Sequence, residues 1–206
     1  MKTKILLFLT LLSLVGCSKD DPKPPEPQAQ LPPETQTGAN TFGCNVNNQL
    51  FYPRDGRYGT FPSGSINKAI KVWGAPGGMQ EFNEIEIING VTRKPISSMI
   101  IHLQGLNAMG IGIYNWNDTN FQSSIDGPME NYLYCSVYNY NSNTYENYGS
   151  YNNSGKVNIT RYDLPNRIVS GTFSGTLRIQ NGSQLLEIHN GRFDIKWDTL
   201  DKTTFK

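Results

Sequence analysis

The sequence has little charge, few histidines and few cysteines, and each shortage argues against a class of function. Charged residues make up 17% of the 206 residues and the formal net charge is +1, so no basic surface for nucleic acid is predicted. Neither histidine, His102 or His189, has a second His or Cys at metal-ligand spacing, so we expect no metal site and no cofactor. A Gly-x-Ser-x-Gly nucleophile motif is also missing. The sequence therefore predicts a protein that is not an enzyme.

Long apolar runs are scarce as well, apart from one at the N-terminus. Lys2 and Lys4 precede an apolar stretch over residues 5–15, and the small residue Gly16 follows it. A stretch of this length is too short to cross a bilayer core of about 30 Å as a helix. Its charged start and small-residue end are those of a secretory signal peptide. We therefore predict that residues 1–16 are removed.

The end of this segment resembles the lipobox of bacterial lipoproteins. Leu14–Cys17 reads Leu-Val-Gly-Cys. The resemblance implies that diacylglycerol is attached to Cys17, that cleavage occurs before it, and that the new amine is acylated, which anchors the chain to a membrane. The alternative is an ordinary secretory signal with a cysteine nearby.

The next residues resemble the export signal of surface lipoproteins of Bacteroidota, which is a Lys and an acidic pair after the lipidated cysteine. Here Cys17 is followed by Ser18, Lys19, Asp20 and Asp21. The resemblance implies an outer-membrane lipoprotein displayed on the cell surface.

Residues 17–40 carry almost no apolar side chains and are interrupted by proline. Such a segment is expected to be a disordered, partly polyproline-like tether, which at ~3.1 Å per residue would reach roughly 70 Å. The prolines are Pro22, Pro24, Pro25, Pro27, Pro32 and Pro33. The remaining residues, 41–206, are predicted to form a single domain.

The composition and alternation of this domain predict strands. Phe193, Ile195 and Trp197, for example, alternate with polar residues. Asn-Gly pairs between alternating runs, as at Asn181 and Asn190, are typical of antiparallel hairpins. We predict an all-β domain, an antiparallel β-sandwich or open β-barrel. The expected strands lie near 41–46, 49–53, 66–73, 82–89, 97–104, 109–115, 131–140, 156–162, 167–180 and 184–198, the last broken at Asn190.

Both ends of the domain resemble a domain family of unknown function found in lipoproteins of Bacteroidota. The opening over residues 36–47 contains Thr-Gly-Ala-Asn-Thr-Phe-Gly-Cys-Asn-Val-Asn, and the close lies over residues 168–176 and 190–196. The opening departs from the family pattern at Asn48, where glycine is usual. The resemblance implies an antiparallel β fold and assigns no catalytic residue.

Two cysteines remain after Cys17. Cys44 and Cys135 could form a disulfide outside the cytoplasm, or they could be two separate buried thiols. Cys135 lies between Leu133 and Val137 on one face of its strand, which favours burial.

A tyrosine-rich segment gives the candidate binding residues. By alternation, Tyr132, Tyr134, Tyr138 and Tyr140 share one strand face, and Tyr148 follows in a loop rich in Asn, Ser and Gly. Tyrosine and asparagine together offer flat apolar area and adaptable hydrogen bonds to a ligand. The alternative is a tyrosine ladder that stabilises the sheet through cross-strand contacts.

These features predict a membrane-tethered binding or structural accessory module. The expected ligand is a glycan, a peptide or a neighbouring envelope protein, contacted by the tyrosines. One alternative is a secreted carbohydrate-active hydrolase with a noncontiguous acid pair. Another is a lipocalin-like carrier, which requires a closed and hollow barrel.

Overall fold

A computed structural model of the chain describes residues 30–58, 65–75, 81–90 and 96–206. Within these residues, no helix has the length and hydropathy needed to cross a bilayer. The predicted signal peptide (1–16), the lipidation site Cys17 and the first part of the expected tether lie outside the described residues.

The described chain is mostly antiparallel β-structure, so the predicted all-β class is confirmed. The helical elements are α1 (Leu106–Met109) and the 3₁₀ helices η1 (Ser124–Asp126) and η2 (Trp197–Lys202). The strands are β1 (Thr41–Val46), β2 (Gln49–Phe51), β3 (Gly56–Tyr58), β4 (Ser65–Asn67), β5 (Ile70–Ala75), β6 (Phe82–Ile88), β7 (Ile96–Gln104), β8 (Gly112–Asn115), β9 (Tyr132–Asn139), β10 (Thr144–Gly149), β11 (Gly155–Asp163), β12 (Ile168–Ile179) and β13 (Leu185–Lys196).

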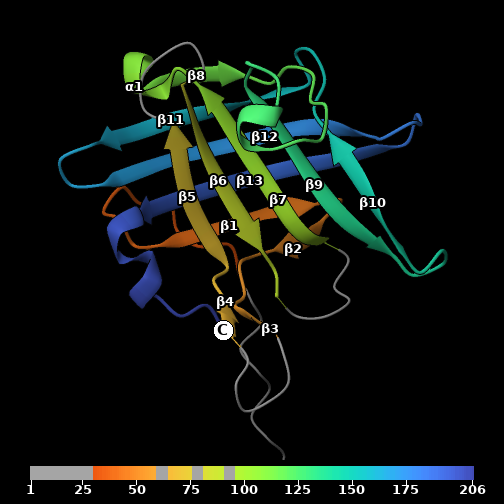
Figure 1. The fold of residues 1–206 in the computed structure, drawn as a ribbon, viewed down its shortest axis with the longest axis horizontal. Coiled ribbons are helices and arrows are strands. Elements are labelled where there is room, and N and C mark those ends of the chain that lie inside the picture. The colour runs from red at the N-terminus through yellow and green to blue at the C-terminus, as the bar shows by residue number, and fades with distance from the viewer. Residues whose placement is uncertain (1–29, 59–64, 76–80, 91–95) are drawn as a thin grey trace, which may run out of the picture.

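Eleven strands form one curled sheet with the order β2-β1-β13-β12-β10-β9-β7-β6-β5, and β11 and β8 branch from β12. Strands β3 and β4 form a separate small pair. Figure 1 shows β5, β6, β7, β9 and β10 crossing in front of β12, β13 and β1. The sheet thus folds over into two facing layers and forms a half-barrel.

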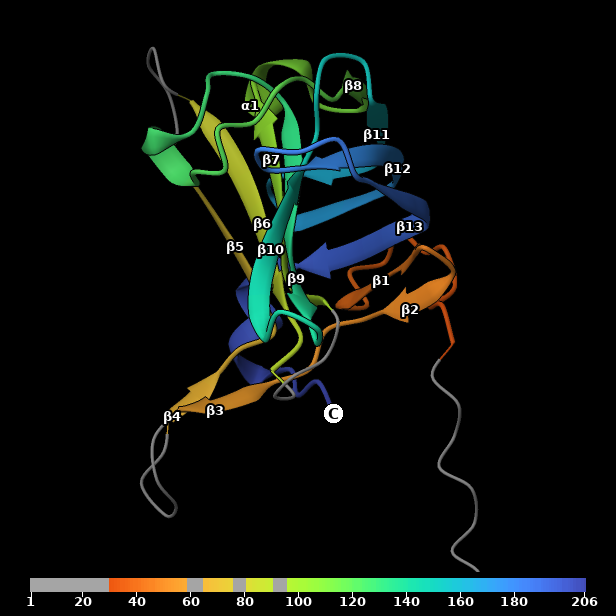
Figure 2. The same cartoon turned by 90° about the vertical axis from the view of Figure 1, so that its right-hand side faces the viewer.

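Strand β12 is where the two layers join. Residues Ile168–Gly175 pair with β11, whereas Arg178 and Ile179 pair with β10. Two strands cannot occupy the same stretch of one edge, so β10 and β11 leave β12 in different directions, as the end-on view in Figure 2 shows. The closed barrel that a lipocalin-like carrier requires is not formed by the described strands.

The core lies between the layers and is built by alternation. On β6, Ile85 and Ile87 face inward and are almost fully buried. Trp116 is fully buried beside β11 and β12, and its indole Nε1 donates to the Ser174 carbonyl at 3.1 Å. A Cβ atom on Gly155 would lie 2.7 Å from the Trp116 ring, so the indole packs where β11 lacks a side chain.

Two local predictions were wrong. The chain does not turn at Asn190, because β13 continues through it with Asn190 at a φ of 52° and the register shifts there. A bulge of this kind adds one residue without ending the strand. Residues Thr144–Gly149, expected to be loop, form β10, which pairs with β9 along its whole length.

Residues 30–40, which we call the N-terminal strap, lie against the sheet beside β1 and β13, on the right of Figure 2. Its central contact is with the carboxylate of Asp194 on β13, which is 1% exposed. The donors within 3.1 Å of the Asp194 oxygens are the backbone N–H groups of Thr37, Gly38 and Ala39 and the hydroxyls of Thr35 and Ser170.

These donors determine the charge state of Asp194. Burial alone would raise its pKa, but the hydrogen bonds from Thr35, Ser170, Ala39 and Gly38 together outweigh burial and lower the pKa to about 2. The expectation of a disordered tether through residue 40 is therefore wrong for residues 30–40. Buried backbone donors need an acceptor, and Asp194 supplies one from a strand more than 150 residues away.

We predict that Asp194→Asn destabilises the domain by about 2 kcal/mol at pH 7, because the low folded-state pKa stabilises the charged carboxylate relative to the unfolded chain. That contribution is complete above about pH 4, the unfolded value, and is lost as the pH falls toward 2. Urea unfolding of the lipid-free chain 17–206 carrying Cys17→Ser measures both effects.

The matched control is Asp201→Asn, which makes the same change on the exposed surface of η2. The control should unfold like the parent. Equal stability of Asp194→Asn and the parent from pH 7 to pH 3 would contradict the role given to Asp194.

Candidate functional site

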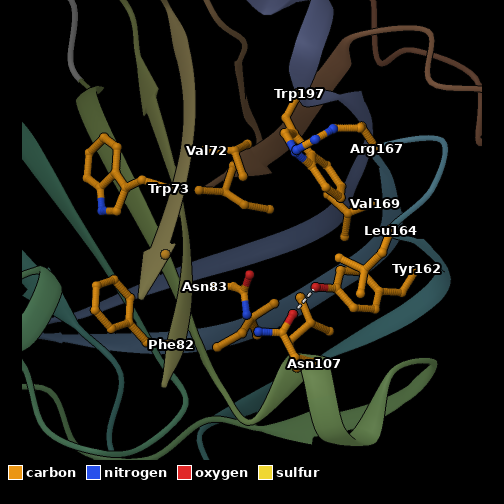
Figure 3. Close-up of a pocket in the computed structure, with 14 residues that line it drawn as sticks. Val72, Trp73, Phe82, Asn83, Asn107, Tyr162, Leu164, Arg167, Val169 and Trp197 are labelled. Carbon is orange, nitrogen blue, oxygen red and sulfur yellow. Dashed lines mark hydrogen bonds between the residues drawn. The ribbon is translucent and has the colours of Figure 1, made fainter. Parts of the chain in front are cut away.

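The candidate site is a pocket of about 270 Å³ on the side of the half-barrel where β5 and β11 are not paired. Figure 3 shows it between β5 and β6 and the segment from Tyr162 to Val169. Helix η2 contacts β5 across one end and α1 borders the other. The pocket therefore lies at the gap that the folding of the sheet leaves between its two layers.

Most of the pocket wall is apolar or aromatic. Val72 on β5 faces Val169 on β12, and the ring of Tyr162 stacks on that of Trp197 with centroids 6.4 Å apart and an interplanar angle of 27°. The other apolar side chains of the inner wall are Ile85, Leu103, Leu106 and Leu164. Trp73 and Phe82 border the pocket from the far side of β5 in the view of Figure 3.

Asn83 on β6 places an amide in this apolar wall. Its Nδ2 atom is buried and has no hydrogen-bond partner. The opposite residue on β5 is Gly74, and a Cβ there would lie 2.4 Å from the Phe82 carbonyl oxygen and 3.3 Å from Asn83 Oδ1. The absence of a side chain at Gly74 thus lets the Asn83 amide lie against β5.

A second amide residue of the pocket lining, Asn107, lies on α1. The hydroxyl of Tyr162 donates to Asn107 Oδ1, and the backbone N–H of Asn107 donates to Glu81 Oε1 at 3.1 Å. Burial raises the pKa of Tyr162, and the nearby carboxylate of Glu81 raises it further, so Tyr162 remains a neutral donor at pH 7. Asn83 and Asn107 both line the pocket and are both labelled in Figure 3.

The one charged residue among the described pocket lining is Arg167. It has a φ of 59°, and its carbonyl oxygen accepts a hydrogen bond from the Trp197 N–H at 3.0 Å. Figure 3 places its side chain near Trp197, away from Asn83 and Asn107. No carboxylate lines the described pocket. The arrangement is that of a binding pocket, with apolar walls and a few polar groups at defined positions.

The five tyrosines proposed as ligand contacts are not brought together on one open surface. Tyr132 is fully buried and Tyr148 is 3% exposed, so neither can contact a ligand in this structure. Tyr148 lies opposite Cys135 and faces the core instead of sharing a face with the others. Tyr134 is half-buried against Phe121.

Tyr132 is buried by the segment from Gln122 through η1 (Ser124–Asp126), which lies over the outer face of the sheet and which we call the covering segment. The ring of His102 lies between Phe82 and Tyr132, with centroid distances of 5.0 and 4.3 Å. The Tyr132 hydroxyl donates to the Gln122 carbonyl at 3.0 Å, which holds the covering segment in place. This half of the predicted patch therefore stabilises the fold.

At the other end of β9, Tyr138 is buried, whereas Tyr140, in the turn that follows the strand, is exposed. Tyr138 packs edge-to-face against Tyr140 and Tyr145, each with centroids 5.1 Å apart. Tyr140 and Tyr145 are 61% and 52% exposed. Of the predicted tyrosine patch, the part that a glycan or protein could contact is this cluster at the β9–β10 hairpin.

A buried acid lies under the same covering segment. Glu84 is fully buried and accepts hydrogen bonds from Trp73 Nε1 at 2.8 Å and from the Ser124 N–H at 2.9 Å. His102 Nδ1 lies 3.4 Å from Glu84 Oε1. Because both side chains are covered, the pair can hold the segment but cannot reach a substrate in this structure.

The two cysteines of the domain are free thiols rather than a disulfide, and both are fully buried. Burial raises the pKa of Cys135 to about 12. Burial also raises the pKa of Cys44, and the neighbouring Cys135 raises it further. In this structure the cysteines behave as small apolar core residues.

Comparisons with family models, curated proteins and solved structures found no match to this chain. The family resemblance of the domain therefore stays a prediction. So does lipidation at Cys17, which lies outside the described residues.

The pocket residues were not identified from the sequence, although one signal was present. Asn83 shares the inward face of β6 with Ile85 and Ile87, and a polar residue at such a position needs a reason. Asn107 and Arg167 lie outside the strands and join the pocket through tertiary structure, which alternation does not encode.

We predict that Tyr132→Ala destabilises the domain by about 3–5 kcal/mol, because it removes a buried ring and opens the covering segment. Tyr140→Ala, the same change in the turn after β9, should change stability by less than about 1 kcal/mol because the ring is exposed. Thermal unfolding followed by circular dichroism gives both values. Similar losses for the two variants would show that the assignment of structural and exposed tyrosines is wrong.

Proposed function

We propose that the protein is an outer-membrane lipoprotein whose domain binds a small, largely apolar molecule in the pocket between β5 and Tyr162. The observation that carries the binding function is the pocket itself, which joins an apolar wall to a buried amide donor with no partner. Such a combination is the usual character of a ligand site.

The pocket has room for a ring with a short substituent. An apolar cavity of about 150 Å³ takes up benzene in another protein, and this pocket is about 270 Å³. The stacked rings of Tyr162 and Trp197 offer an aromatic surface to such a ligand. A planar ring packed between them and Val72 would bury apolar area that water now reaches.

The proposed anchor is supported by the sequence. The Leu-Val-Gly-Cys motif ends a short apolar run at Cys17, and lysine and two aspartates follow closely. Two or three acyl chains hold a protein stably on a membrane, whereas one chain does so marginally. The binding domain would then be held at the surface of the outer membrane.

The hydrolase alternative requires two carboxylates that face one cleft. The fourteen described residues that line the pocket include no Asp or Glu, and Glu84 is covered. The geometry therefore favours binding over hydrolysis. The carrier alternative shares the apolar site but places it in a closed barrel, whereas this site lies at the open side of a half-barrel.

We predict that Cys17→Ser abolishes membrane association, because the hydroxyl cannot form the thioether to diacylglycerol. Fractionation of cells that express the protein, together with mass measurement of the purified product, tests this. The parent should be in the outer-membrane fraction with a mass increased by acyl chains. An unmodified Cys17 in a membrane-bound parent would contradict the proposed anchor.

We predict that Val72→Trp fills the pocket and prevents binding of α-methylstyrene, a neutral aromatic hydrocarbon. The parent should bind it with a Kd of about 1 mM, as expected for nine non-hydrogen atoms at modest efficiency. An NMR titration that follows the pocket residues measures the Kd.

The control is Leu185→Trp, which introduces the same side chain at an exposed position on β13 and should leave binding unchanged. The binding function would be refuted if the parent shows no saturable shifts in the pocket. The same conclusion follows if Val72→Trp binds as well as the parent.

A further inference from the structure

We propose that the ligand of this pocket carries an uncharged carbonyl group, as in a ketone or carboxamide, which accepts a hydrogen bond from Asn83 Nδ2. The inference rests on the proposed function, because it names the polar end of the molecule that the pocket binds. The observation behind it is a buried, unpartnered amide N–H on a residue of a largely apolar pocket wall, which a second amide residue, Asn107, also lines.

Asn83 carries a buried donor without an acceptor. Such a donor costs about 1–3 kcal/mol, and most buried polar groups are paired. Asn83 is one of the residues that line the pocket, and because its Nδ2 atom is buried, the side chain must turn for that atom to meet a ligand. A ligand oxygen placed against it would supply the missing acceptor.

Asn107, which also lines the pocket, has an amide donor of its own. Its Oδ1 accepts the Tyr162 hydroxyl proton, so its Nδ2 group remains to donate. A carbonyl oxygen has two lone pairs and can accept from more than one amide N–H group.

The amide donors of Asn83 and Asn107 are neutral, and the carboxylate of Glu81 accepts the Asn107 backbone N–H. A carboxylate ligand would be desolvated there without a cation and would be repelled by Glu81. Arg167 lies near Trp197 instead. The site therefore favours a neutral acceptor over an anion.

Three probes of nearly the same shape separate these ideas: acetophenone, α-methylstyrene and benzoate. Acetophenone and α-methylstyrene differ only in an oxygen that replaces a methylene group. The expected result is that acetophenone binds the lipid-free chain about tenfold more tightly than α-methylstyrene, which corresponds to one hydrogen bond to an otherwise unpaired donor. Benzoate should bind more weakly than acetophenone. NMR titration gives the three dissociation constants, and the Asn83 side-chain N–H signals should shift with acetophenone.

The matched variant is Asn83→Leu, which nearly keeps the size of the side chain and removes the oxygen and nitrogen of its amide group. It should bind α-methylstyrene like the parent and lose the preference for acetophenone. The comparison of the three probes on the parent does not depend on this variant, so the proposal remains testable if the variant does not fold.

Each outcome has one meaning. A tenfold preference that Asn83→Leu removes supports the proposal. Equal binding of acetophenone and α-methylstyrene overturns it while the proposed binding function stands. Tightest binding by benzoate also overturns it and indicates recognition of an anion through Arg167. No saturable binding by any probe overturns both this proposal and the proposed function.

Discussion

The architecture depends on strand β12, because two different strands pair with one of its edges. Strand β12 pairs with β13 along one side, but its other side pairs with β11 over Ile168–Gly175 and with β10 only at Arg178 and Ile179. Because the two partners diverge, the sheet folds into facing layers joined at β10 and β12, and β5 and β11 end opposite each other without pairing. Helices α1 and η2 border the gap that results, and the pocket lies in the gap between them.

A second long-range contact extends the described fold toward the N-terminus. Asp194 binds the N-terminal strap through backbone and hydroxyl donors, so the folded unit includes residues 30–40 and does not begin at residue 41. If Cys17 carries the anchor, twelve residues, 18–29, lie between it and the strap. A chain of that length spans at most roughly 45 Å when fully extended. The proposed binding site would then stay closer to the membrane than the predicted tether over residues 17–40 would allow.

Much of the fold was predictable because alternation and turn chemistry are local. The Asn47-Asn48 turn shows this, since both residues have the positive φ that a tight hairpin demands. Strand β10 was missed because Thr144–Gly149 contains few apolar residues and gains its order from pairing with β9. The Asn190-Gly191 pair, which resembles a turn, is a bulge because β1 and β12 hold β13 on both sides.

The site was far less predictable. Tyr132, Tyr134 and Tyr138 do share a face of β9, but the segment that covers Tyr132 comes from η1 and its neighbours, and no periodicity indicates that contact. The pocket combines residues from β5, β6, α1, β11 and η2, so its polar end exists only after the layers fold together. A crystal structure of the lipid-free chain with acetophenone is the most direct test. The account predicts a ring between Val72 and Tyr162 with its carbonyl oxygen on Asn83 Nδ2. A ring bound elsewhere, or side chains that close the gap between β5 and Tyr162, would contradict it.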